Sequence, residues 1–169
     1  MAMRRAGAAH VLRTLAKAAL IFAVLPFAVV TTALAGTVDE MAGRWSGWGS
    51  VQMENGQTEQ VKCVATYFVE RSGAGVRQNL RCASSSYAIN ARADYQVKGS
   101  DVTGNWEELT HSAKGQIKGS LKEGDFKLAI AGDTFTAVLQ MTSAPCQQSI
   151  NISPQNLGVR RISIGLKKC

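Results

Sequence analysis

The sequence predicts an all-β domain, an antiparallel up-and-down β-barrel of about eight to ten strands. Three observations predict it. Apolar and polar residues alternate with a period of two along most of the chain after residue 36. Turn signals recur about every 8 to 12 residues, and the connections are too short for crossover helices. A two-sheet β-sandwich is the alternative, and the barrel is preferred because closure removes exposed strand edges.

The alternation is clearest from residue 87 to 98, where Tyr87, Ile89 and Tyr95 share one face with Ala91, Ala93 and Val97. Short connections such as Gly99-Ser100 and Glu123-Gly124 then join neighbouring strands as hairpins. Ten segments are predicted as strands: Arg44–Met53, Gln60–Glu70, Gly75–Ala83, Tyr87–Lys98, Asp101–Thr110, Lys114–Leu121, Asp125–Ala131, Thr134–Met141, Gln147–Ser153 and Val159–Leu166.

Residues 1–35 have the organisation of a secretory signal peptide. Basic residues and no acidic ones precede the apolar stretch Ala18–Val30, and the small-residue site Ala33-Leu34-Ala35 follows it. Cleavage is therefore expected before Gly36, and the protein is expected in the periplasm or secreted, with no stable membrane span. An uncleaved anchor is the alternative, but the apolar segment is short for a bilayer and Pro26 interrupts it.

Removing the 35-residue leader from the 169 residues leaves 134, enough for one domain at 36–169. Four of the 19 Lys and Arg lie in the leader and all 12 Asp and Glu follow it, so the mature net charge is +3. This modest charge gives little support to nucleic-acid binding.

All four cysteines lie in the mature part, which favours two disulfides in an oxidising compartment. A two-residue turn at Ser72-Gly73 would place Cys63 opposite Cys82, so these two are predicted to pair. Cys146 and Cys169 then form the second disulfide around the turn at residues 155–158, although Cys169 is out of phase with its strand. No C-x-x-C spacing occurs and His111 is the only mature histidine, so neither a metal nor a cofactor is predicted.

Gly43-Arg44-Trp45 resembles the G-x-W signature of the calycin superfamily, which includes lipocalins and avidin-like proteins. The resemblance implies a ligand-binding barrel and an arginine late in the chain that packs over Trp45. Arg160 and Arg161 are the matching candidates, through a cation–π contact. The sequence departs from the superfamily, because it lacks the other lipocalin motifs and any biotin-site pattern, and has ten predicted strands instead of eight. The A-G-R-W stretch is also similar to bacterial periplasmic inhibitors of metalloproteases.

Small inward residues beside aromatic ones have two interpretations. Gly47 and Gly49 are predicted to share the inward face of their strand with Trp45, and Gly104 to share one with Trp106. Further inward glycines occur at positions 115 and 119. They either carve an apolar pocket or relieve crowding where strands coil, and the second interpretation is the stronger. If a ligand binds, the expected contacts are aromatic: Trp45, Trp48, Trp106, Tyr87, Tyr95 and Phe126.

Catalytic constellations are nearly absent, so an enzyme is not favoured and no catalytic residue is predicted. His111 lies in a turn-like segment, and no G-x-S-x-G motif accompanies it. Glu107 and Glu108 are adjacent on a strand and point to opposite faces. Glu108 is expected to face inward, and therefore to lie near the barrel rim or to pair with an arginine.

The sequence thus favours an exported binding protein for a small apolar or amphipathic ligand. The alternative is an envelope interaction protein or protease-inhibitor-like module. It would act through the segment Gly36–Ala42 or through outward arginines that meet an envelope component: Arg71, Arg77, Arg81 and Arg92. Oligomeric state and ligand identity are not predicted.

Overall fold

The computed structural model describes residues 38–169, so the predicted signal peptide lies outside the described residues. A short 3-10 helix, η1 (Val38–Met41), precedes ten strands. The strands are β1 (Gly43–Met53), β2 (Thr58–Val69), β3 (Gly75–Ala83), β4 (Ala88–Lys98), β5 (Asp101–Glu108), β6 (Ala113–Lys122), β7 (Asp125–Gly132), β8 (Thr136–Ala144), β9 (Gln147–Gln155) and β10 (Val159–Lys167). Each matches a predicted segment, with ends that differ by a few residues.

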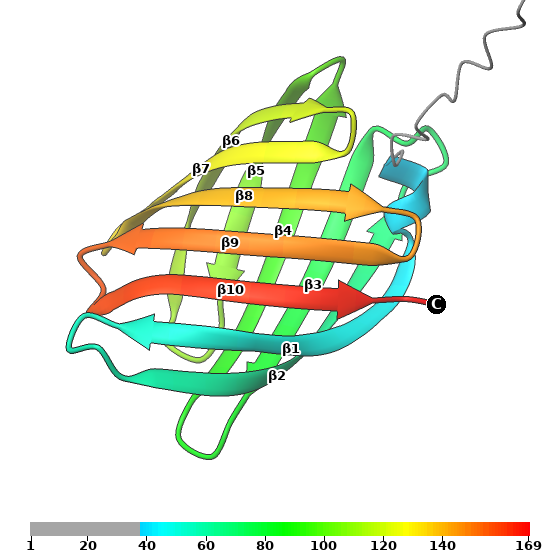
Figure 1. The fold of residues 1–169 in the computed structure, drawn as a ribbon. Coiled ribbons are helices and arrows are strands. Elements are labelled where there is room, and N and C mark those ends of the chain that lie inside the picture. The colour runs from blue at the N-terminus through cyan, green and yellow to red at the C-terminus, as the bar shows by residue number, and fades with distance from the viewer. Residues whose placement is uncertain (1–37) are drawn as a thin grey trace, which may run out of the picture. The chain divides into compact units, whose positions relative to one another are not determined.

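The strands form one closed barrel in which each is antiparallel to its neighbours in the chain (Figure 1). β10 closes the barrel on β1, with a ladder from Ser46 opposite Lys167 to Met53 opposite Val159. This confirms the barrel over the sandwich, and no strand keeps an unpaired edge. Within residues 38–169 the four-residue η1 is the one helical segment, and no described helix has the length or apolarity to span a membrane.

The Cys63–Cys82 disulfide is present, and the two residues lie opposite each other on β2 and β3. The connecting turn is longer than predicted: Glu70 N donates to Gly75 O at 2.9 Å, and residues 71–74 form the loop. The predicted pairing of Cys63 with Cys82 is nevertheless correct, because the longer loop has the same centre, between Ser72 and Gly73, as the predicted two-residue turn.

The Cys146–Cys169 disulfide is also present. Cys146 lies in the turn between β8 and β9, and Cys169 follows β10. Gln147 on β9 pairs with Lys167 on β10, so both cysteines lie just beyond the same end of this ladder. Neither is held in a strand, and for that reason the disulfide does not require the two residues to be in phase.

The inward glycines allow neighbouring backbones to approach closely. A Cβ built on Gly104 would overlap the carbonyl of Asp94, and one on Gly115 would overlap the carbonyl of Ala131. Gly47 and Gly119 have the same relation to their neighbours. The pocket interpretation of these glycines is therefore not supported, because they face backbone where the strands coil.

Candidate binding site at the open end of the barrel

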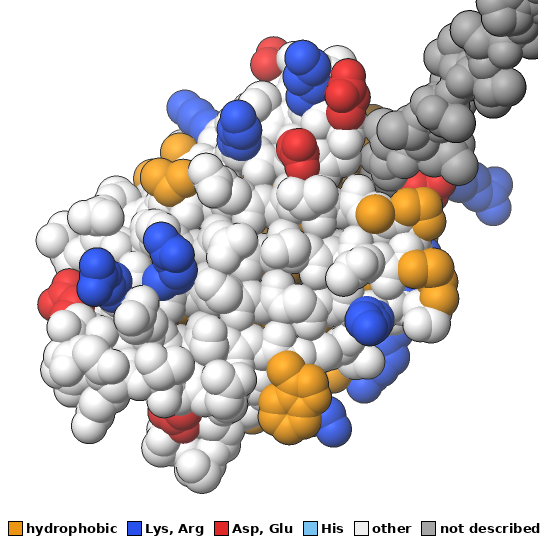
Figure 2. Space-filling view, in the orientation of Figure 1, with side chains coloured by type: hydrophobic (Ala, Val, Ile, Leu, Met, Phe, Trp, Pro, Cys, Tyr) orange, Lys and Arg blue, Asp and Glu red, His pale blue; other side chains and the backbone are white. Residues whose placement is uncertain are grey.

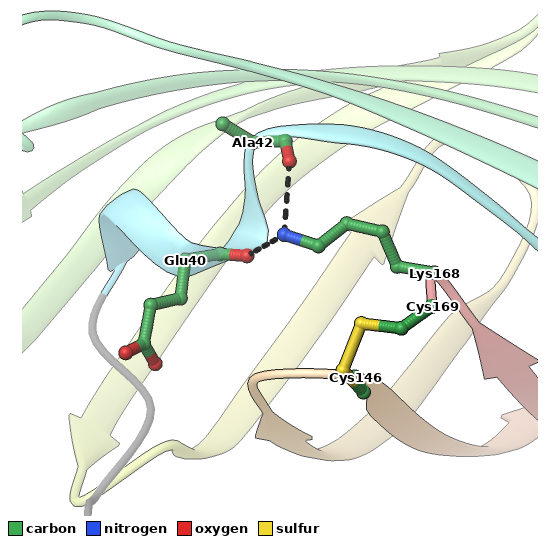
Figure 3. Close-up of a disulfide and its surroundings, with 5 residues drawn as sticks. All are labelled: Glu40, Ala42, Cys146, Lys168 and Cys169. Carbon is green, nitrogen blue, oxygen red and sulfur yellow. Dashed lines mark hydrogen bonds between the residues drawn. A yellow bond between two sulfur atoms is a disulfide. The ribbon is translucent and has the colours of Figure 1, made fainter.

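One end of the barrel is closed by η1 and the segment that follows it. Met41 is buried there, and its carbonyl accepts a hydrogen bond of 2.7 Å from Trp45 Nε1. Lys168 Nζ donates to the carbonyls of Glu40 at 2.6 Å and Ala42 at 3.2 Å, beside the Cys146–Cys169 disulfide (Figure 3). The first and last segments of the barrel are thus joined at this end.

Lys168, and neither Arg160 nor Arg161, provides the cation over Trp45, with Nζ 5.1 Å from the ring centroid. The expected arginine contact is wrong for a topological reason. β10 runs antiparallel to β1, and Arg161 pairs with Gln52, far along β1 from Trp45. Only the C-terminal end of β10 reaches the start of β1, and this constraint was available from the antiparallel meander.

A buried polar cluster lies inside the barrel. Tyr67 OH donates to Gln148 Oε1 at 3.0 Å, and Gln148 Nε2 donates to Ser143 Oγ at 3.1 Å. Gln78 Nε2 donates to Tyr67 OH at 3.4 Å. Burial raises the pKa of Tyr67, and its hydrogen bond to Gln148 offsets this only in part. Burial, with Tyr67 nearby, also raises the pKa of Tyr95. Both phenols therefore stay neutral, and the Tyr67 hydroxyl is hydrogen-bonded, as a buried polar group requires.

No helix among the described residues covers the opposite end, which we call the open end. In a closed barrel, residues of the same strand parity as the buried core point inward, yet at this end many of them are only half-buried. They come from opposite parts of the barrel wall: Leu80, Ile89, Ala91 and Ala93 on β3 and β4, Trp106 on β5, and Ile130, Leu139 and Ile152 on β7, β8 and β9. These inner-wall side chains are therefore partly exposed to solvent at this end, whereas Ala137, Pro154 and Val159 nearby are buried.

Aromatic side chains stand at the rim of this open end. The ring centroids of Trp106 and Phe135 are 5.2 Å apart, and those of Tyr87 and His111 are 6.5 Å apart. A Cβ on Gly132 would lie 2.7 Å from Trp106 Cζ2, so the glycine makes room for the indole. Trp106 Nε1 is buried and has no hydrogen-bond partner among the described residues. A buried N–H donor without a partner is energetically unfavourable.

Glu108 lies at the rim, as one of its two predicted placements required. Its carboxylate accepts backbone N–H bonds from Asn90 at 2.9 Å, Thr110 at 3.0 Å and His111 at 2.6 Å. His111 Nδ1 lies 2.8 Å from the same carboxylate. Burial raises the pKa of Glu108, but the three backbone hydrogen bonds outweigh it and lower the pKa to about 2. Glu108 is thus ionised, and it orders the loop after β5.

A second rim carboxylate is Glu59, near the start of β2. It accepts hydrogen bonds from the hydroxyls of Ser84 and Ser86, the latter at 2.6 Å. These two hydrogen bonds lower the pKa of Glu59. They also fix the loop between β3 and β4, which ends at Tyr87. The rim therefore carries two negative charges above an apolar interior.

The six aromatic residues predicted to contact a ligand are separated by the structure. Trp106 and Tyr87 lie at the open end, whereas Trp45, Tyr95 and Phe126 are buried in the packed core. Trp48 points outward and is 63% exposed, so it cannot reach the interior. The aliphatic residues at the open end were missed, because alternation reports the face of a side chain and not its depth along the barrel.

Two of the four outward arginines, Arg77 and Arg92, form ion pairs, whereas neither Arg71 nor Arg81 forms one with another described residue. A groove of about 550 Å³ on the outside of β2 to β6 has lining residues that include Arg77, Asp94, Asn105 and Gln116. Arg77 contacts Asp94 at 3.1 Å, and Arg92 contacts Glu107 at 3.2 Å. These exposed pairs neutralise part of the basic face that the alternative interpretation needs. Buried Met41 likewise ties the end of the segment 36–42 to the barrel.

No family model matches this sequence, and none of the curated proteins compared with it matches. Several solved structures are similar, and two of them are described here. The S-type phycobiliprotein lyase CPES from Guillardia theta has a TM-score of 0.56 at 14% identity, over 78% of this chain and 90% of that chain. A protein of unknown function from the DUF3598 family of Nostoc punctiforme has a TM-score of 0.57 at 11% identity, over 83% of this chain.

The chain spans about half of the Nostoc protein, 53% of its length, and nearly all of the lyase. At these identities the likeness concerns the fold alone. It supports the closed antiparallel β-barrel, and it identifies no sequence family.

Proposed function

We propose that this protein binds a small apolar or amphipathic molecule through the open end of its barrel. The observation that carries the proposal is the set of inward apolar side chains that remain half-buried inside a closed barrel. Small closed barrels such as lipocalins and streptavidin hold one small ligand in this position. The two disulfides suit the oxidising compartment of an exported binding protein.

The chemistry of the site restricts the ligand. Its apolar part would contact Leu80, Leu139 and Ile152, and an oxygen or nitrogen acceptor would take the hydrogen bond of Trp106 Nε1. Glu59 and Glu108 are ionised at neutral pH, because hydrogen bonds lower the pKa of both. A neutral or cationic polar group is therefore favoured at the rim, and a carboxylate or phosphate is disfavoured.

The test is a fluorescence titration with N-phenyl-1-naphthylamine, a neutral apolar probe. We expect saturable binding by the wild type and about tenfold weaker binding by Leu139→Glu, which puts a charge on the inner wall. Val138→Glu is the matched control, because Val138 precedes Leu139 on β8 and points outward with 54% exposure. The proposal fails if the probe does not saturate, or if both variants bind it as the wild type does.

Native mass spectrometry of the protein from its own host identifies the natural ligand. We expect a reproducible added mass that disappears on denaturation. We also expect a smaller fraction of the Trp106→Phe protein to carry this mass, because the substitution removes the indole N–H. A bare mass from several preparations, combined with failed probe binding, would redirect the search to protein or envelope partners.

A further inference from the structure

The outer surface of β8, β9, β10 and β1 is chemically distinct. The sequences of these four strands contain no Asp or Glu. Their outward positions are mostly hydroxyl and amide side chains: Ser46, Ser50, Gln52, Thr136, Gln140, Thr142, Gln147, Ser149, Asn151, Ser153, Gln155 and Ser163. In Figure 2 the surface over β8 to β10 is largely uncharged, with most Lys and Arg side chains toward its margins.

One large aromatic side chain lies on this surface. Trp48 is 63% exposed, and its cross-strand neighbours are Gly165 on β10 and Lys62 on β2. A Cβ built on Gly165 would meet nothing within 4 Å. Gly165 pairs on its other side with Ser149, so no side chain stands between Trp48 and that serine two strands away. The indole therefore borders an open surface.

The open space beside Trp48 is a shallow groove of about 300 Å³. Its lining combines the indole with neutral polar groups, namely Ser50, Gln60, Ser149 and Ser163. At its edge the Ser163 hydroxyl donates to Asn151 Oδ1 at 2.9 Å, which holds a hydroxyl and an amide side by side. The groove thus offers one apolar platform and several hydrogen-bonding groups without charge.

We propose that this groove, centred on Trp48 and Gly165, binds a neutral carbohydrate chain. A sugar ring has an apolar C–H face that can stack on an indole, and hydroxyls that exchange hydrogen bonds with Ser, Asn and Gln. The uncharged lining of the groove matches such a ligand, and the nearby basic residues, Lys62 on β2 and Arg161 and Lys167 on β10, lie outside that lining. This site lies on the outside of the barrel and is independent of the interior one.

A second copy of the chain fits the groove less well. The core of a homodimer interface is enriched in apolar and aromatic side chains, whereas here a single indole lies among hydroxyls and amides. Gly165 leaves the groove unfilled. The strand does not need a glycine at this position, because a Cβ built on Gly165 would meet nothing within 4 Å. An open strand position without a side chain favours access for a ligand.

The test is electrophoresis through gels that contain a neutral soluble polysaccharide, with hydroxyethyl cellulose, galactomannan and glycogen in parallel and polygalacturonate as the anionic polymer. We expect at least one neutral polymer to retard the wild type. Trp48→Ala should weaken this binding about tenfold, and Trp48→Phe should weaken it less. Phe68→Ala is the matched control, an exposed aromatic on β2 outside the groove, and should bind normally.

Gly165→Gln separates binding from folding. Its Cβ would meet nothing within 4 Å and its longer side chain would project over the groove, so it should abolish retardation while the unfolding midpoint stays unchanged or rises. The proposal is overturned if no neutral polymer retards the wild type, if only polygalacturonate does, or if Trp48→Ala binds normally. It is also overturned if Trp48→Ala converts a sedimenting dimer to a monomer. Probe binding inside the barrel should be unchanged in both variants, so this proposal and the interior one fail separately.

Discussion

Lys168 Nζ lies 5.1 Å from the Trp45 ring centroid and donates hydrogen bonds to the carbonyls of Glu40 and Ala42. One ammonium group from the chain end thus links three elements: η1, the start of β1, and the segment after β10. Trp45 is fully buried beneath it and donates its own N–H to Met41. The closed end is therefore held by contacts between residues far apart in the sequence.

Lys168→Met should lower the free energy of unfolding by about 1 to 3 kcal/mol, because it removes a cation–π contact and two charge-assisted hydrogen bonds. Lys168→Arg should lose less, since it keeps the cation. Urea unfolding of both variants measures this, with Lys167→Met as control for an exposed neighbour. Equal effects at positions 167 and 168 would contradict a specific role for Lys168.

The Cys146–Cys169 disulfide should be coupled to Lys168. Cys169 is the next residue, so the disulfide holds the chain end where Lys168 makes its contacts. Replacing both cysteines by alanine should itself lower stability by about 3 kcal/mol. In that background Lys168→Met should lower it by less than in the wild type, because the freed end populates the contact less. A double-mutant cycle measures the difference, and strict additivity would contradict the coupling.

Ten strands and the Cys63–Cys82 register were predictable because alternation and hairpin symmetry are local properties of the sequence. Trp45 and Trp48 are three residues apart on one strand, so if Trp45 points inward, Trp48 must point outward. The sequence alone could therefore have excluded Trp48 from an interior site. The contact of Lys168 with Trp45 depends on how the barrel closes, which no local pattern reports. Depth along the barrel, which decides that Leu139 is accessible and Phe126 is not, requires the strand registers of the whole barrel.

Glu108→Gln should lower the free energy of unfolding at neutral pH and not at low pH. The folded-state pKa of Glu108 is about 2, below its ordinary value of 4.5, so its stabilisation is complete above pH 4.5 and lost as the pH falls toward 2. At pH 7 the loss should be on the order of 1 to 3 kcal/mol, since a charged acceptor of three backbone N–H bonds is removed.

Urea unfolding of wild type and Glu108→Gln at pH 7, 4 and 2.5 measures this dependence. The gap between the two should narrow as the pH falls. Glu107→Gln is the control, because Glu107 is adjacent and faces outward beside Arg92. A gap that stays constant with pH would mean that the charge of Glu108 does not contribute.

Alanine at two glycines should have opposite effects on stability. Gly115→Ala places a Cβ into the carbonyl of Ala131 on β7, and the backbone must move to accept it, which should cost about 1 to 3 kcal/mol. Gly165→Ala adds a Cβ where nothing lies within 4 Å, and a strand residue with a side chain should stabilise by up to about 1 kcal/mol. Thermal unfolding of the pair tests this. If Gly115→Ala is neutral, the inward glycines are not needed for strand approach, and their interpretation as walls of a pocket returns.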